Sequence, residues 1–258
     1  MVKIIVTNLF VLLAVAFVYA QQEEVPMIQM QTGKGTVYNS EQSFEFRLAT
    51  NGFGLGFNYG SIKTFYKSRL TYFSLSNVRS FKEVRQDKKI INVPSAPYQY
   101  GKINYLYNLE AGKCIKYFWS DKAPGKGVLV GYVLGAGVTL GILQPVFLKV
   151  KYTNPDDNEL HYKDIKYTEE TKETFLADDD IIGRSRLFKG LFQSILVPGL
   201  HGKAAIHCDF GKSDKFIAAL EVGTKINLYT QAIQLVAFAP KKPYLIDLYL
   251  SLQFGKRS

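Results

Sequence analysis

The strongest constraint on the fold is a strict alternation of residue types in the last segment of the chain. One face of this segment is wholly apolar and consists of Tyr244, Ile246, Leu248, Leu250, Leu252 and Phe254. The other face carries Asp247, Tyr249, Ser251 and Gln253. A period of two indicates a β-strand whose two faces meet different surroundings.

The same alternation recurs in other parts of the chain. Over 216–228, apolar residues alternate with a second set that includes Glu221 and Lys225. Near the beginning, the apolar residues of 44–48 and 53–59 alternate with polar residues or glycine, and Asn51-Gly52 between them is a strong hairpin signal. These segments therefore predict neighbouring antiparallel strands.

Four further segments bring the expected strand count to about eight: 69–79, 98–109, 127–140 and 203–210. Alternating segments of about ten residues, separated by turns, are typical of transmembrane β-barrels. Two connections are tight turns, at 66–68 and 211–214, and three are long, at 80–97, 141–201 and 230–242. The connection 109–127 is an exception, because it is long although it falls at the end of the barrel where the turns are tight. We therefore expect an all-β, transmembrane, antiparallel up-and-down β-barrel with both chain ends on the side of the short turns.

The beginning of the chain predicts export. Lys3 precedes an apolar run from Leu9 to Val18, and the run is followed by Ala20 and then by polar residues. This is the pattern of a signal peptide over 1–20. We expect a periplasmic segment at 21–40, the barrel at 41–258 and a location in the bacterial outer membrane.

The connection 141–201 is too long for a plain loop. Within it, three aspartates at 178–180 are predicted to cap a short amphipathic helix. Its apolar side would carry Ile181, Ile182, Leu187, Phe188, Leu191 and Phe192. Such a helix either packs on the loop itself or serves as a lid, plug or interfacial helix, and the residues do not separate these alternatives.

The charges that fall on the second face of the strands should point into the lumen. They are Glu45, Arg47, Asp209, Glu221, Lys225 and Asp247. Unpaired charges in a narrow lumen are costly, so we expect an ion-pair network rather than a conduction path. The apolar face of 244–254 should contact lipid or a partner barrel.

Charge and cysteine content narrow the choice of partners. The chain has 32 Lys and Arg against 22 Asp and Glu, a formal net charge of +10. Export disfavours nucleic acid as a partner. The expected counter-charge is outer-membrane lipid, anionic lipopolysaccharide or an acidic protein, and the alternative is a solvated basic surface without a partner.

No disulfide is expected between Cys114 and Cys208, because Cys208 falls on an outward face. The two Cys and three scattered His have no zinc-ligand spacing, and no cofactor is expected.

Several motifs resemble the small conserved outer-membrane β-barrel proteins of the Bacteroidetes type. They are Gly-Arg-Ser-Arg-Leu-Phe-Lys-Gly at 183–190, Pro198-Gly199-Leu200 with Gly202-Lys203, Ala219-Leu220-Glu221-Val222-Gly223, and the ending 248–256. The resemblance implies a fold and a location more than an activity. One departure is that the aromatic Phe254 is followed by Gly-Lys-Arg-Ser instead of ending the chain.

These observations favour a structural or accessory membrane protein, with membership of a larger outer-membrane assembly or export complex as an attractive role. The alternative is a lipid-modifying barrel enzyme that uses His207, Asp209 or Ser251. A nucleophile needs its base within hydrogen-bond reach, and the sequence has no Gly-x-Ser-x-Gly turn to present one. We therefore do not expect an enzyme.

Overall fold

The computed structural model describes residues 38–64, 66–86, 97–119, 127–153, 160–177, 180–185, 189–211 and 215–258. The predicted signal peptide at 1–20 and most of the predicted periplasmic segment at 21–40 lie outside these residues.

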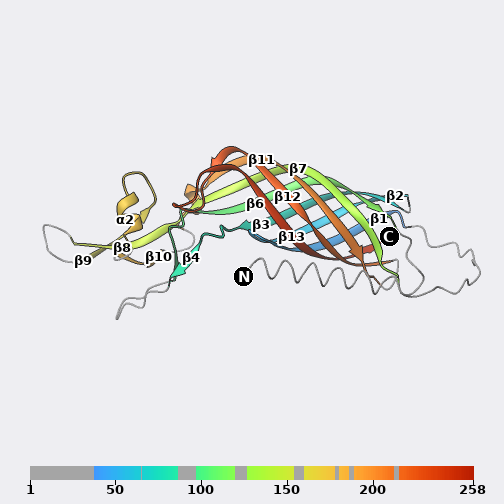
Figure 1. The fold of residues 1–258 in the computed structure, drawn as a ribbon, viewed down its shortest axis with the longest axis horizontal. Coiled ribbons are helices and arrows are strands. Elements are labelled where there is room, and N and C mark those ends of the chain that lie inside the picture. Colours follow the sequence, from blue (N-terminus) through green and yellow to red (C-terminus); the bar gives the residue numbers. More distant parts are fainter. Residues whose placement is uncertain are drawn as a thin grey trace, which may run out of the picture. The chain divides into compact units, whose positions relative to one another are not determined.

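Eight strands form a closed antiparallel barrel (Figure 1). They are β1 (Ser40–Ala49), β2 (Gly52–Thr64), β3 (Lys67–Val78), β6 (Asn104–Phe118), β7 (Leu129–Pro145), β11 (Ile195–Asp209), β12 (Phe216–Ile233) and β13 (Lys242–Arg257). Each strand pairs with the barrel strands before and after it along the chain, and β1 pairs with β13 to close the barrel. The prediction of an all-β, up-and-down barrel of eight strands is thus confirmed.

The hairpin predicted at Asn51-Gly52 is present. Ala49 pairs with Gly52, so Thr50 and Asn51 form the turn. Gly52 has φ of 142°, and a Cβ there would lie 1.9 Å from the backbone oxygen of Asn77. Glycine is needed because both the backbone conformation and the close approach of β3 exclude a side chain.

Two ends of the barrel can be distinguished by their connections. The chain end at Ser258, which hydrogen-bonds to Ser40, lies at the same end as the β2–β3, β6–β7 and β11–β12 connections. We call this the short-turn end. The opposite, long-loop end carries the connections β3–β6, β7–β11 and β12–β13, together with the tight β1–β2 turn.

The strands are tilted, so that a row of paired residues climbs along the barrel wall. Starting at Phe44, in the half of β1 nearer the short-turn end, the pairing leads through β2, β3, β6, β7, β11 and β12 to Tyr244. Tyr244 lies at the long-loop end of β13. Paired rows therefore rise from β1 towards β13 in this direction, as barrel closure requires.

Several predicted strand limits were wrong. The segment 98–109 is divided between β5 (Tyr98–Tyr100), which pairs with β4 (Val84–Gln86), and the start of β6. Most of the expected turn at 109–127 is strand, because β6 continues to Phe118. The residues of β6 do not alternate clearly between apolar and polar. Lys113 faces outward, and the inward face contains Cys114 and Phe118 as well as charged residues. Strand β11 also begins earlier than expected, and the predicted loop at 230–242 shortens to 234–241.

The connection between β7 and β11 covers 146–194 instead of the expected 141–201, and it contains secondary structure of its own. It contains β8 (Phe147–Thr153), β9 (Leu160–Lys166), α2 (Lys172–Leu176), β10 (Ile181–Arg184) and the 3-10 turn η2 (Leu191–Gln193). The three strands form a sheet in the order β10-β8-β9. Its core contains Val146, Leu148, Val150, Ile165, Phe175 and Ile181, with Tyr98 from β5.

The helix expected after the three aspartates is wrong for Ile181 and Ile182, and Leu191 and Phe192 lie in the 3-10 turn η2; Leu187 and Phe188 lie outside the described residues. Ile181 and Ile182 belong to β10, where Ile181 pairs with Val150 and is buried. β-branched residues favour a strand when a partner strand can cover them. The short helix α2 precedes the aspartates instead, and it buries Phe175 against the same sheet core.

Candidate functional site

All six predicted lumen residues lie inside the barrel, with relative exposures of 3% or less. Alternate positions of each strand face inward, as the burial patterns of β1, β11, β12 and β13 show. Five of the six take part in ion pairs that extend through the lumen, and further charged residues join them. We call this set of interactions the lumen network.

At the short-turn end, the lumen network begins with Asp209 and Arg257, whose Oδ2 and Nη2 atoms are 2.6 Å apart. Arg257 Nε lies 3.8 Å from a carboxylate oxygen of Glu41, and Lys116 Nζ lies 2.6 Å from the other oxygen. Lys116 also donates a hydrogen bond to the side chain of Gln253. Buried ions at this end are thus paired across four strands.

Glu221 occupies the middle of the lumen network. It accepts hydrogen bonds from the Tyr249 hydroxyl at 2.6 Å and from the Gln253 amide at 2.8 Å. His207 Nδ1 lies 3.4 Å from Glu221 Oε2. Lys203 Nζ lies 3.9 Å from both Glu221 and Glu45, and it therefore links this group to the next.

The part nearer the long-loop end is built on Glu110. Its carboxylate receives Lys225 Nζ at 2.7 Å, the Ser74 hydroxyl at 2.8 Å and Arg47 Nη1 at 3.4 Å. Arg47 also pairs with Glu45 at 2.8 Å. The network thus continues without a gap from the short-turn end to the level of Lys225.

Asp247 departs from the expected pairing. It lies opposite Lys225 in the β12–β13 register, but Lys225 Nζ is directed to Glu110. No ion pair of Asp247 is found among the described residues, and its Oδ1 has no hydrogen-bond partner there. The register thus places Asp247 beside Lys225, but the carboxylate of Glu110 on β6 binds the lysine instead.

Five members of the lumen network were not predicted: Glu41, Glu110, Lys116, Lys203 and Arg257. Lys203 and Asp209 lie an even number of residues apart on β11, so both face inward. Lys203 could therefore have been predicted from the alternation that identified Asp209. Glu110 and Lys116 lie where a turn was expected, and Glu41 and Arg257 lie at strand ends.

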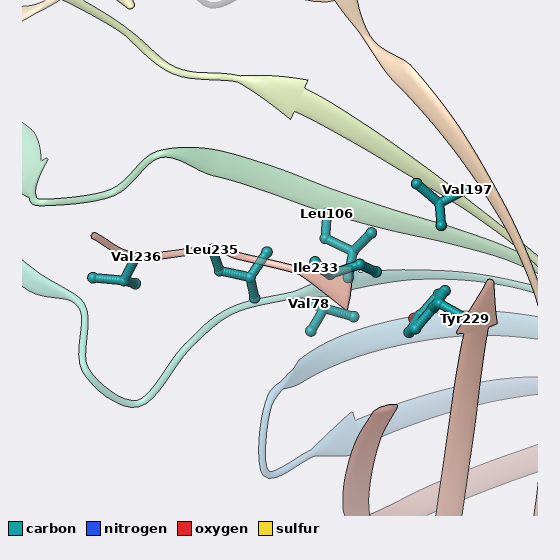
Figure 2. Packing of buried hydrophobic residues seen from close by; sticks show 7 residues of the cluster. All are labelled: Val78, Leu106, Val197, Tyr229, Ile233, Leu235 and Val236. Atoms are coloured by element: carbon teal, nitrogen blue, oxygen red, sulfur yellow. The ribbon is translucent and has the colours of Figure 1, made fainter. Parts of the chain in front are cut away.

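An apolar cap closes over the lumen network towards the long-loop end. It consists of Val78, Leu106, Val197, Tyr229, Ile233, Leu235 and Val236 (Figure 2). Leu235 and Val236 follow β12, and the backbone oxygen of Leu235 accepts a hydrogen bond from Ile103. The Tyr229 hydroxyl donates to Asn108 Oδ1 at 3.0 Å, at the border between cap and network.

The candidate catalytic residues are not assembled for nucleophilic catalysis. His207, Asp209 and Ser251 are fully buried. Ser251 Oγ and His207 Nε2 have no hydrogen-bond partner among the described residues, so this serine and this histidine are not paired. Asp209 is held by Arg257 and by the backbone amide of Gly211.

The outer wall of the barrel is mainly apolar. The six predicted lipid-facing residues of β13, from Tyr244 to Phe254, are between 41% and 59% exposed. At the short-turn end, Tyr132 packs with Tyr117 and with Trp119, at 5.6 Å between ring centroids in both pairs. An apolar band bordered by aromatic residues is the surface that a bilayer requires. No helix in the described part of the chain is long and apolar enough to span a membrane.

Both cysteines are free. Cys114 is buried in the lumen, beside Leu70 and Tyr72, whereas Cys208 occupies an outward position of β11. The two thiols thus lie on opposite faces of the wall.

Comparison with known proteins gives fold-level similarity only. No family model matches the sequence, and no curated relative does. Among solved structures, Neisserial surface protein A is 11% identical, with a TM-score of 0.37 over 86% of this chain and 97% of that one. Ail, the attachment invasion locus protein of Yersinia pestis, is 8% identical, with a TM-score of 0.36 over 86% of this chain and 99% of that one. A second structure of Ail, in complex with the heparin analogue sucrose octasulfate, has 8% identity and a TM-score of 0.34 over the same shares.

Proposed function

We propose that this chain is an integral outer-membrane β-barrel with a plugged polar lumen and a structural or accessory role. The apolar outer wall, bordered by aromatic side chains, supports insertion into a bilayer. The expected signal peptide supports export. The resemblance to Bacteroidetes-type barrel proteins is part of this proposal.

The observation that carries the proposal is the filling of the lumen. An eight-stranded barrel has an interior just wide enough for side chains. Here the lumen network occupies the interior up to Lys225, and the apolar cap covers the next layer. Ions would have to displace paired buried charges and then cross an apolar layer, so a conducting role is disfavoured.

The test is conductance in planar bilayers. Purified full-length protein is expected to give no steady channels under conditions in which a porin reconstituted in parallel conducts. Steady, ion-selective channels from this protein would show that the lumen is open and would overturn the proposal of a plug.

The insertion between β7 and β11 supports an accessory role, because it places a small folded sheet among the connections of the long-loop end. The strands of this sheet carry Lys149, Lys151, Lys163, Lys166 and Arg184 against Asp164, while acidic residues such as Glu169, Glu170 and Glu173 lie between β9 and β10. The formal net charge of +10 for the whole chain favours lipopolysaccharide phosphates or an acidic protein surface as the partner. Affinity purification in mild detergent, followed by mass spectrometry, would identify a protein partner. Recovery of the protein free of stable partners would argue against a subunit role.

A further inference from the structure

The outer wall carries cations without matching carboxylates. All six carboxylates of the eight barrel strands are buried in the lumen: Glu41, Glu45, Glu110, Asp209, Glu221 and Asp247. In contrast, Arg69 of β3 and Lys113 of β6 are exposed on the outside. Neither forms an ion pair within the described residues. Within the described residues, the barrel strands thus expose these two cations on the outside without a carboxylate to balance them.

Lys113 lies within the apolar band rather than at its edge. Its outward neighbours on β6 are Ala111 and Ile115, and its partners across the sheet are Thr71 and Ala136. Tyr117 and Trp119 stand between it and the short-turn end. A cation on the lipid-facing side of a barrel is destabilising at this depth unless it reaches the interface or meets an anion.

Arg69 supplies a second positive charge beside Lys113. Arg69 is opposite Ile115 in the β3–β6 register, so it is the diagonal neighbour of Lys113. Such neighbours lie about 7–8 Å apart. Because long cationic side chains extend towards the nearer interface, both groups can reach the level of the headgroups at the short-turn end.

An apolar hollow of about 550 Å³ begins at Lys113 and extends across β7 and β11 to β12. Its floor includes the small residues Ala136, Gly202, Ala204 and Thr224, and its larger lining side chains are Ile115, Leu134 and Ile226. Lys113, Ala136, Gly202 and Ile226 form one paired row. Since paired rows climb in this direction, the hollow leads from the cations towards the long-loop end, as an acyl chain would lead away from its headgroup.

We propose that this surface binds an anionic phospholipid from the leaflet at the short-turn end. Its phosphate would contact Lys113 and Arg69, and one acyl chain would lie along the hollow. The charges and the hollow together match an amphiphile with a negatively charged head. This inference rests on the proposed membrane location.

The test uses the full-length protein purified in dodecyl maltoside. Dioleoyl phosphatidylglycerol or dioleoylglycerol, which has the same acyl chains but lacks the phosphate, is added, and bound lipid is measured by native mass spectrometry. Phosphatidylglycerol is expected to be retained about tenfold more strongly than dioleoylglycerol, because a charge-assisted contact is lost without the phosphate.

Two variants separate the charge from the hollow. Lys113→Gln should reduce retention of phosphatidylglycerol about tenfold. Ala136→Leu should reduce it by filling the hollow while leaving both cations in place. Lys256→Gln is the matched control, because it removes an exposed cation at the end of β13, away from the hollow.

Equal retention of phosphatidylglycerol by Lys113→Gln and the unchanged protein would overturn the proposal, as would equal retention of dioleoylglycerol and phosphatidylglycerol. Loss of a dimer in Lys113→Gln with unchanged lipid retention would show that a second copy occupies the surface instead. The same samples, run unboiled on a gel, report whether the barrel is folded. A folded barrel without selective lipid retention would refute this inference and leave the proposed function standing.

Discussion

At the scale of single residues, Glu110 shows how the lumen tolerates buried charge. Three side chains from three other strands, Arg47, Ser74 and Lys225, contact its carboxylate. Removing one partner of a buried ion pair leaves an uncompensated charge and typically costs about 3–5 kcal/mol. The stability of the interior therefore depends on groups of residues rather than on isolated pairs.

Adjacent residues of β13 allow a test of which face meets lipid. Leu250 is exposed on the outer wall, whereas the neighbouring Ser251 is buried and its hydroxyl has no partner among the described residues. Leu250→Arg would place a charge in the apolar band at a cost of about 2–4 kcal/mol, so the amount of heat-modifiable barrel recovered from membranes should fall sharply.

Ser251→Ala is the matched control. It removes a hydroxyl without a partner and should assemble normally. Equal tolerance of both substitutions would mean that β13 does not face lipid in this register. Normal assembly of Ser251→Ala together with loss of a lipid-modifying activity would instead favour the enzyme alternative.

At the scale of elements, the β7–β11 insertion packs around a core outside the lumen, to which Tyr98 of β5 and Tyr105 of β6 contribute, whereas the barrel is held by pairing between its strands. Phe175 of α2 is fully buried in the insertion core and packs edge-on against Tyr167, with the ring centroids 5.5 Å apart. Every barrel strand pairs with two others regardless of this core. The insertion should therefore unfold without loss of the barrel.

Phe175→Asp tests this expectation. Truncating a buried phenylalanine costs about 3–5 kcal/mol, and burying a carboxylate in its place adds to that cost. Limited proteolysis should cleave within 146–194 while the heat-dependent gel shift of the barrel is retained. Phe192→Asp is the control, because Phe192 is 98% exposed and its replacement should not increase cleavage. Loss of the gel shift in Phe175→Asp would show that the insertion and the barrel fold as one unit.

At the scale of the whole molecule, closure by β1 and β13 leaves no unpaired strand edge in the barrel. A closed barrel satisfies every backbone group that the bilayer would otherwise leave without a hydrogen-bond partner. Such barrels resist detergent until they are heated, because all eight strands must separate together.

The processed protein is accordingly expected in the outer-membrane fraction, with faster migration on gels before boiling than after it. The measurement is fractionation of cells followed by electrophoresis of boiled and unboiled samples. Recovery in the soluble periplasm, or identical migration before and after boiling, would contradict the membrane barrel. A periplasmic protein of the same cells controls for leakage between fractions.

The sequence by itself determined that the chain forms an antiparallel barrel of about eight strands and, where alternation is clear, which way the side chains face, but it did not determine all of the strand limits. Alternation is a local property, because the orientation of a side chain in a strand follows from its position alone. Lumen residues such as Glu45 and Glu221, and outward residues such as Leu250, could therefore be assigned from neighbouring residues.

Only the tertiary structure decided which charges meet and how the long connection folds. Glu41 and Lys116 are 75 residues apart, and Lys225 and Glu110 are 115 apart. Such pairs depend on strand register, tilt and the competing partners on a third strand, as the displacement of Asp247 from Lys225 shows. Ile181 likewise became part of a strand because β8 was available to cover it. Local patterns fix the orientation of a side chain, whereas its partner is selected by the closure of the whole barrel.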